Sequence, residues 1–254
     1  MKFNHRVSLG SKFNQIYIPN AFCNSFEVGD LVEVKLLKKK TQLYYSDNLK
    51  HLSKFKENIL KSTFSVLNQI KDVSQVYVFG SFLTKTVDYR DIDILLVTDN
   101  ATLEELAFNK LTKELNLKFH IISVNEDKLN HLIKICPLVR SMFYYCISNK
   151  EVIRLPQQEI EKNHIMFLLM MPEDILTTNL SSKYFYDSLR RLVTIEQFLK
   201  GKGLDPKLIN ELLENALDKS LIKALMNNEL LNKKEISDLR WRINEKLNYI
   251  KKRL

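Results

Sequence analysis

The pairs Gly80-Ser81 and Asp91/Asp93 are the residues of this chain whose types and spacing can support chemistry. In a strand, Asp91 and Asp93 would project to one face and the intervening Ile92 to the other. Two neighbouring carboxylates repel each other unless a cation lies between them, and Mg²⁺ takes oxygen ligands that it shares with phosphates. Gly80 lets the backbone approach a phosphate, and the Ser81 hydroxyl can donate a hydrogen bond to it. The pattern predicts a metal–triphosphate site.

Two apolar runs must position these residues. Residues 76–79 precede the glycine, and residues 94–97 follow the second aspartate. We interpret both runs as short buried strands bounded by turns. A second interpretation remains open, in which Gly-Ser is an ordinary turn and the two aspartates form a solvated edge.

The order strand, Gly-Ser, nine residues, Asp-apolar-Asp, strand resembles the nucleotidyltransferase superfamily related to DNA polymerase beta, and most closely its minimal and kanamycin-nucleotidyltransferase-like branches. The resemblance implies transfer of a nucleoside monophosphate from a nucleoside triphosphate to an acceptor hydroxyl on a protein or small molecule. It implies that Asp91 and Asp93 hold two Mg²⁺ ions and that Gly80 and Ser81 cradle a phosphate. A triphosphate such as ATP is the expected substrate.

Lys85 and Arg90 are the candidate phosphate ligands beside this core. Lys85 lies in the loop between the two halves of the motif, where it is either a phosphate contact or a surface lysine. Arg90 directly precedes Asp91, where relatives often carry serine. It pairs either with Asp88 or with a substrate phosphate, and both interpretations remain open.

His120 marks a departure from the family pattern. Active relatives bring a third carboxylate from the later strand, but here the strand reads Phe119-His120-Ile121. Phe119 and Ile121 would face the helices, so His120 would face the cleft as a third catalytic candidate. A neutral histidine can act as a base, although it cannot bridge Mg²⁺ as a carboxylate does. Glu126 or Asp127 would otherwise supply the missing acid, or the site binds nucleotide with little or no turnover.

Three regions follow from the periodicity of the chain. We expect a small β unit over 1–45, a nucleotidyltransferase domain over 49–156 and a C-terminal helical domain over 159–254. The middle region reads helix, strand, strand, helix, strand. The predicted fold class is an α/β core, a mixed sheet with helices on one face, preceded by a β-hairpin unit and followed by an all-α bundle.

The N-terminal region resembles a second family. Residues 15–19 read Gln-Ile-Tyr-Ile-Pro, and residues 28–36 read Val-Gly-Asp followed by an alternating run. This order resembles AbrB-like swapped hairpins, which implies a DNA-binding dimer of the kind found in antitoxins and regulators. The alternative is a hairpin that packs on the neighbouring domain.

Composition limits the classes of partner and compartment. The formal net charge is +9, which favours anionic partners such as nucleotides or duplex DNA. The basic segment 232–254 either binds nucleic acid or an acidic partner, or is a solvated helix face. The three cysteines have no metal-like spacing and cannot all pair, which favours a reducing cytoplasm. Residues 1–15 are too polar for a signal peptide, and the apolar run 165–171 is too short for a membrane span.

Two hypotheses from different classes follow. The first is a metal-dependent nucleotidyltransferase whose helical region binds the acceptor, acting in the manner of antitoxins that adenylylate a partner protein. The second is a DNA-binding regulator or antitoxin with a degenerate domain that binds nucleotide without turnover. No arginine is followed four to six residues later by a histidine, the signature of the RNases that accompany such enzymes, so a fused RNase is not expected.

Overall fold

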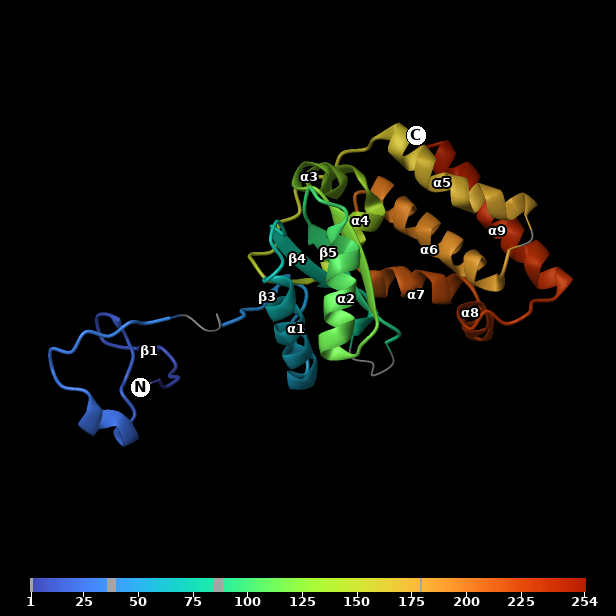
Figure 1. Cartoon of the computed structure of the whole chain (residues 1–254). Helices are drawn as coiled ribbons and strands as arrows, with labels where there is room; N and C mark the ends of the chain where they lie inside the picture. Colours follow the sequence, from blue (N-terminus) through green and yellow to red (C-terminus); the bar gives the residue numbers. More distant parts are fainter. Residues whose placement is uncertain (1, 36–39, 85–88, 179) are drawn as a thin grey trace. The chain divides into compact units, whose positions relative to one another are not determined.

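The computed structural model describes residues 2–35, 40–84, 89–178 and 180–254 (Figure 1). The chain divides into two compact units, Met1–Lys40 and Thr41–Leu254. The predicted small unit ended near residue 45, whereas Tyr44–Tyr45 pair with a strand of the larger unit. The larger unit therefore begins before the first long helix and contains all the predicted site residues.

The smaller unit is built from a short hairpin and a 3-10 helix. β1 (Ser8–Leu9) pairs antiparallel with β2 (Asn14–Gln15), and η1 (Asn20–Ser25) follows. None of the unit's described residues is buried, and Val28 and Leu31 are fully exposed. A segment this short without an apolar core needs a partner surface to be stable.

The two segments that carry the AbrB-like resemblance form little strand. Residues 15–18 contribute only Gln15 to β2, and the described residues 31–35 lie in no strand. A strand requires a partner for its backbone donors and acceptors, and the described part of this unit provides none for residues 31–35. The AbrB-like resemblance stays a prediction.

The larger unit contains a five-stranded mixed sheet with the order β3-β7-β4-β5-β6. Its strands are β3 (Tyr44–Tyr45), β4 (Gln75–Phe79), β5 (Ile92–Val97), β6 (Phe119–Val124) and β7 (Ile147–Ser148). All neighbours are antiparallel except β5 and β6, which are parallel. A parallel pair needs a crossover, and the helix α2 (Leu103–Leu115) supplies it.

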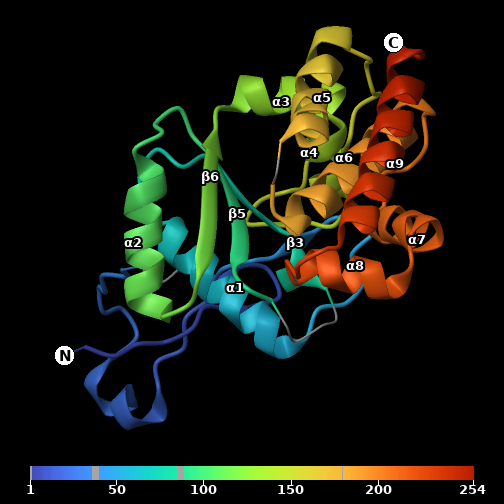
Figure 2. The same cartoon turned by 90° about the vertical axis from the view of Figure 1, so that its right-hand side faces the viewer.

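Helices pack on both faces of the sheet. α1 (Lys54–Leu67) and α2 pack on the face that carries Val78 and Ile94. Figure 2 shows α2 on one side of β5 and β6, and the later helices on the other. The expected α/β core is confirmed, and the structure adds α3 (Glu126–Ile135) and α4 (Pro137–Tyr144) on the second face, where they share a core with the strands.

Local caps explain where the helices of the core begin and end. The Ser53 side chain accepts a hydrogen bond from the Lys56 backbone N–H at the start of α1, and the Asn125 side chain caps α3 in the same way. α2 ends at Asn116, whose φ of 51° is the left-handed conformation of a C-terminal cap. These polar residues fix where α1 and α3 begin and where α2 ends.

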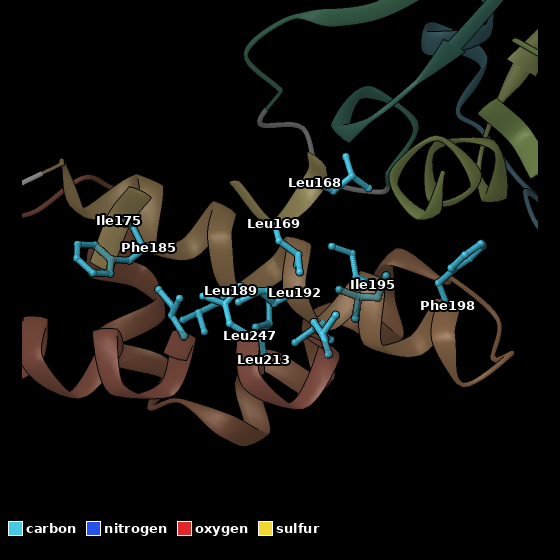
Figure 3. Close-up of a cluster of buried hydrophobic side chains, with 14 of the residues drawn as sticks. Leu168, Leu169, Ile175, Phe185, Leu189, Leu192, Ile195, Phe198, Leu213 and Leu247 are labelled. Carbon is cyan, nitrogen blue, oxygen red and sulfur yellow. The ribbon is translucent and has the colours of Figure 1, made fainter. Parts of the chain in front are cut away.

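The remaining chain forms the expected helical region. Its helices are α5 (Lys162–Thr177), α6 (Ser182–Leu199), α7 (Pro206–Ala216), α8 (Lys219–Met226) and α9 (Lys233–Lys251). Figure 3 shows their shared core, in which leucine, isoleucine and phenylalanine side chains from α5 and α6 meet Leu213 and Leu247. α5 continues through an interior proline, Pro172. Burial of Leu169 and Ile175 on either side offsets the roughly 3 kcal/mol that an interior proline costs.

Within the described ranges, all helices are too short or too polar to cross a bilayer. The last helix begins with a capping box, in which Asn232 and Glu235 each accept a hydrogen bond from the other's backbone N–H. On α9 the apolar side chains Leu239, Ile243 and Leu247 are buried, as expected of an amphipathic helix.

Candidate active site

Strand register brings the candidate residues into one row. Phe79 of β4 pairs with Asp93 of β5, and Asp93 pairs with His120 of β6. Gly80 directly follows Phe79, so the glycine, the aspartate and the histidine lie at the same level of the sheet. The next row on this face, Tyr77, Leu95 and Ile122, belongs to the core that α3 and α4 share, and Phe79 is the member of the Asp93 row that also belongs to it.

Gly80 lies against the carboxylate of Asp93. Its φ is +83° and its ψ is −162°, a conformation that is essentially restricted to glycine. A Cβ atom at this position would collide with Oδ2 of Asp93. The site therefore requires glycine for two separate reasons, its backbone conformation and the close approach of a carboxylate.

The environment of Asp93 disfavours the charged form of its carboxylate. Its side chain is 23% exposed, and burial is the largest cause of a pKa above the ordinary value. The charge of Asp91 raises the pKa further, whereas the hydrogen bond and charge of His120 lower it. The two aspartates therefore repel each other across a half-buried site, and a bound cation would relieve that repulsion.

His120 lies beside Asp93 in an exposed position. Its Nδ1 is 3.0 Å from Oδ1 of Asp93, and its side chain is 61% exposed. The neighbouring Phe119 is buried in the core of the opposite face, as the alternation predicted. If Nδ1 donates to Asp93, Nε2 carries the lone pair.

Glu126 and Asp127 do not reach this row. Both lie in the first turn of α3, beyond the end of β6 at Val124. β6 continues for four residues beyond His120, about 13 Å, before α3 begins. The expectation that one of these acids supplies the third carboxylate is wrong, because the parallel pairing places Asp93 beside the start of β6 and the two acids follow the end of β6.

The phosphate-ligand candidates are placed in part. Ser81 is exposed at the start of η2 (Ser81–Leu83), directly after Gly80. Arg90 is exposed directly before Asp91. Lys85 and Asp88 lie outside the described residues, so both partners predicted for Arg90, Asp88 and a substrate phosphate, stay predictions.

The donor set fits a divalent cation in part. Asp91 and Asp93 offer carboxylate oxygens, the ligands that Mg²⁺ prefers, and their mutual repulsion favours a cation. Among the described residues, however, no group of three or more histidine, cysteine, aspartate or glutamate side chains is arranged to hold a metal ion. The residues present fit a cation held by two carboxylates and completed by water and phosphate oxygens.

Lys56 is a residue of this region that the sequence pattern missed. It lies on the buried side of α1 and is 7% exposed, and its Nζ donates to the carbonyl oxygen of Thr84 at 2.8 Å. The neighbouring Phe55, although apolar, is 68% exposed. The available signal was the spacing of Lys56 with Leu60 and Phe64, which places it on the buried face.

A mixed sheet with helices packed on it defines an α/β domain, and its glycine–serine turn lies beside Asp93, one of the paired aspartates. Residues 57–169 match the family model described as Nucleotidyltransferase domain. This segment of the chain is therefore a nucleotidyltransferase domain, and the resemblance seen in the sequence is confirmed for it. No curated protein and no solved structure matches the chain.

Proposed function

We propose that this protein transfers a nucleoside monophosphate from a nucleoside triphosphate to a hydroxyl of a protein or small-molecule acceptor. Nucleotidyl transfer in general follows from the domain. The observation that supports the specific proposal is the contact of Gly80 with the Asp93 carboxylate, because it puts a phosphate-binding turn beside a candidate metal ligand. The acceptor approaches over the open row that Asp93 and His120 share.

Each residue has a distinct role in this proposal. The Gly80 amide and the Ser81 hydroxyl bind the β- or γ-phosphate, and Lys85 and Arg90 add positive charge to the triphosphate. Asp91 and Asp93 hold divalent cations, with Mg²⁺ as the expected ion. Bound there, such cations lower the pKa of an attacking hydroxyl and neutralise charge on departing pyrophosphate.

The transfer balances as a single displacement. The acceptor oxygen attacks the α-phosphorus, and its proton passes to Nε2 of His120, which Asp93 orients through Nδ1. The bond from the α-phosphorus to the bridging oxygen breaks, and pyrophosphate leaves with the bonding electrons. His120 thus acts as the general base at the position where relatives carry a third carboxylate.

Two observations favour a second candidate function. His120 replaces the third acid, and the described residues hold no three-ligand metal group. A domain of this kind can bind nucleotide without turnover and act as a regulator. In that case the basic N-terminal unit would contact DNA phosphates, and a second copy of the unit would cover its exposed apolar side chains.

The test is label transfer with a matched pair of variants. The protein is incubated with Mg²⁺ and each α-labelled nucleoside triphosphate in turn, alone and with cell lysate as a source of acceptors, including partner proteins. We expect transfer that Asp93→Asn abolishes and Asp99→Asn preserves, since Asp99 is exposed beyond the end of β5. Equal labelling in wild type and Asp93→Asn would reject the proposed site.

A binding experiment separates the two candidates. Label transfer that is absent throughout, together with binding of a non-hydrolysable triphosphate analogue, supports the regulator. Duplex DNA binding that weakens with salt and disappears when residues 1–40 are deleted would support its DNA-binding role. Deletion at residue 40 keeps Tyr44–Tyr45 in the sheet.

A further inference from the structure

Lys56 is a buried lysine that the proposed chemistry does not use. It lies in the first turn of α1, one residue before the segment that matches the family model. Lysine is almost never fully buried unless its ammonium group is paired. Its partners therefore indicate what the residue does.

The ammonium group of Lys56 contacts both ends of the loop that joins the two halves of the motif. Nζ donates to the Thr84 carbonyl oxygen, and it lies 5.3 Å from the ring centroid of Phe82 and 5.4 Å from that of Tyr89. The two rings also contact each other edge to face, with centroids 4.8 Å apart. Both distances from Nζ are within the range of cation–π interactions.

The positions of these partners connect Lys56 to the site. Phe82 lies two residues after Gly80, and Tyr89 lies two residues before Asp91. One side chain from α1 thus joins the phosphate-binding turn to the start of the strand that carries the aspartates. Strand pairing between β4 and β5 begins only at Phe79 and Asp93, so it does not extend over this loop.

We propose that Lys56 is a positioning residue that sets the distance between the Gly80-Ser81 turn and the Asp91/Asp93 pair. The inference rests on the proposed function, because that distance matters only if one triphosphate bridges the two halves. Misplacing a reacting or binding group by about 1 Å can cost about 100-fold in rate. Lys56 acts through Phe82, Thr84 and Tyr89 and does not touch the substrate.

A purely structural role for Lys56 makes a different prediction. Burial lowers the pKa of Lys56, so keeping its ammonium group inside the fold is unfavourable. Methionine has a similar length, remains apolar between the two rings and removes that burial penalty. A variant with methionine is therefore expected to keep its stability while losing the clamp on the loop.

The experiment compares three variants of the full chain. Lys56→Met removes the ammonium group, Lys56→Arg retains a cation of similar length, and Lys61→Met alters an exposed lysine on the same helix. We expect Lys56→Met to lower kcat/KM for the triphosphate by about 10- to 100-fold. Its thermal midpoint should stay within about 4 °C of wild type. Lys56→Arg should restore part of the rate, and Lys61→Met should match wild type.

Hydrogen exchange provides a readout that does not depend on turnover. The amides of Leu83 and Thr84 donate to the carbonyl oxygens of Gly80 and Ser81, and both should exchange faster in Lys56→Met. If wild type transfers no label, the proposed function fails, and exchange together with binding of a triphosphate analogue still tests the clamp. Wild-type kcat/KM with unchanged exchange in Lys56→Met would overturn the inference. A fall in the thermal midpoint well beyond 4 °C, in both Lys56→Met and Lys56→Arg, would also overturn it, because Lys56 would then be merely structural.

Discussion

Replacing Gly80 with alanine tests the geometry of the site most directly. The φ of +83° and ψ of −162° lie in a region that side chains rarely adopt, which costs of order 1–3 kcal/mol. For a chain of this size, each kcal/mol lowers the thermal midpoint by about 2–4 °C. We therefore expect Gly80→Ala to unfold about 2–12 °C below wild type.

The same substitution should affect the chemistry more than the stability. The added Cβ would collide with Oδ2 of Asp93, so the carboxylate must move away from the turn. That movement disturbs the 3.0 Å contact with His120 and the relation between the turn and the aspartate pair. Label transfer should fall by about 100-fold or more, measured at saturating triphosphate so that the loss appears in kcat.

Two other glycines supply the controls. Gly201 has a φ of +66°, and an added Cβ would make only an ordinary contact with Nε2 of Gln158 at 4.0 Å. Gly201→Ala therefore tests backbone strain without a collision and should cost about 1–2 kcal/mol without loss of transfer. Gly203 has neither a positive φ nor a neighbour within 4 Å, so Gly203→Ala should change nothing or slightly stabilise. The reasoning is refuted if Gly80→Ala is as stable and as active as Gly203→Ala.

Two further predictions concern the rest of the fold. Glu196 accepts hydrogen bonds from Lys200 and Lys246, at 2.5 and 2.7 Å. Burial raises the pKa of Glu196, but the two lysines outweigh burial and hold this pKa below the ordinary 4.5. The ionised Glu196 therefore makes its full contribution to the free energy of unfolding above pH 4.5, and this contribution is lost as the pH falls through the lower pKa of the folded state. Glu196→Gln should lower the free energy of unfolding by about 1 kcal/mol at neutral pH, and in urea denaturation measured over a pH series this free energy should fall less at acid pH than in wild type. An unchanged fall at acid pH would contradict this. Thiol labelling of the native protein should modify Cys23, which is exposed, and spare Cys146, whose pKa burial raises to about 12; rapid reaction of more than one thiol per chain would refute this.

Much of the site followed from alternation and from the motif spacing. Alternation places Phe119 inward and His120 outward, and the structure has Phe119 buried and His120 exposed. Alternation does not reveal which strand lies next to which. The parallel pairing of β5 with β6 is what puts His120 beside Asp93 and removes Glu126 from consideration.

Other features depend on contacts distant in sequence. Periodicity counts apolar residues, so it does not identify the buried position of Lys56, whose ammonium partners come from a loop that follows the next strand. The strand β7 is two residues long and lies at Ile147–Ser148, and the sequence pattern did not place a strand there. A strand this short has no periodicity of its own, and its pairing with β3 and β4 determines its position.

The position of the site in the sheet limits how a ligand can approach. On the face of Asp93, the row of Tyr77 and Leu95 and the row of Val97 are closed by α3 and α4. A shift of one residue between β5 and β6 would turn His120 to the opposite face and leave the half-buried Asp93 carboxylate without this partner, so the register is strongly specified. A ligand can therefore reach Asp93 from the end of the sheet where β4 stops and β5 and β6 begin. That is also the end at which Gly80-Ser81 and the Thr84 carbonyl bound by Lys56 lie, so the proposed binding and positioning groups are concentrated at one edge.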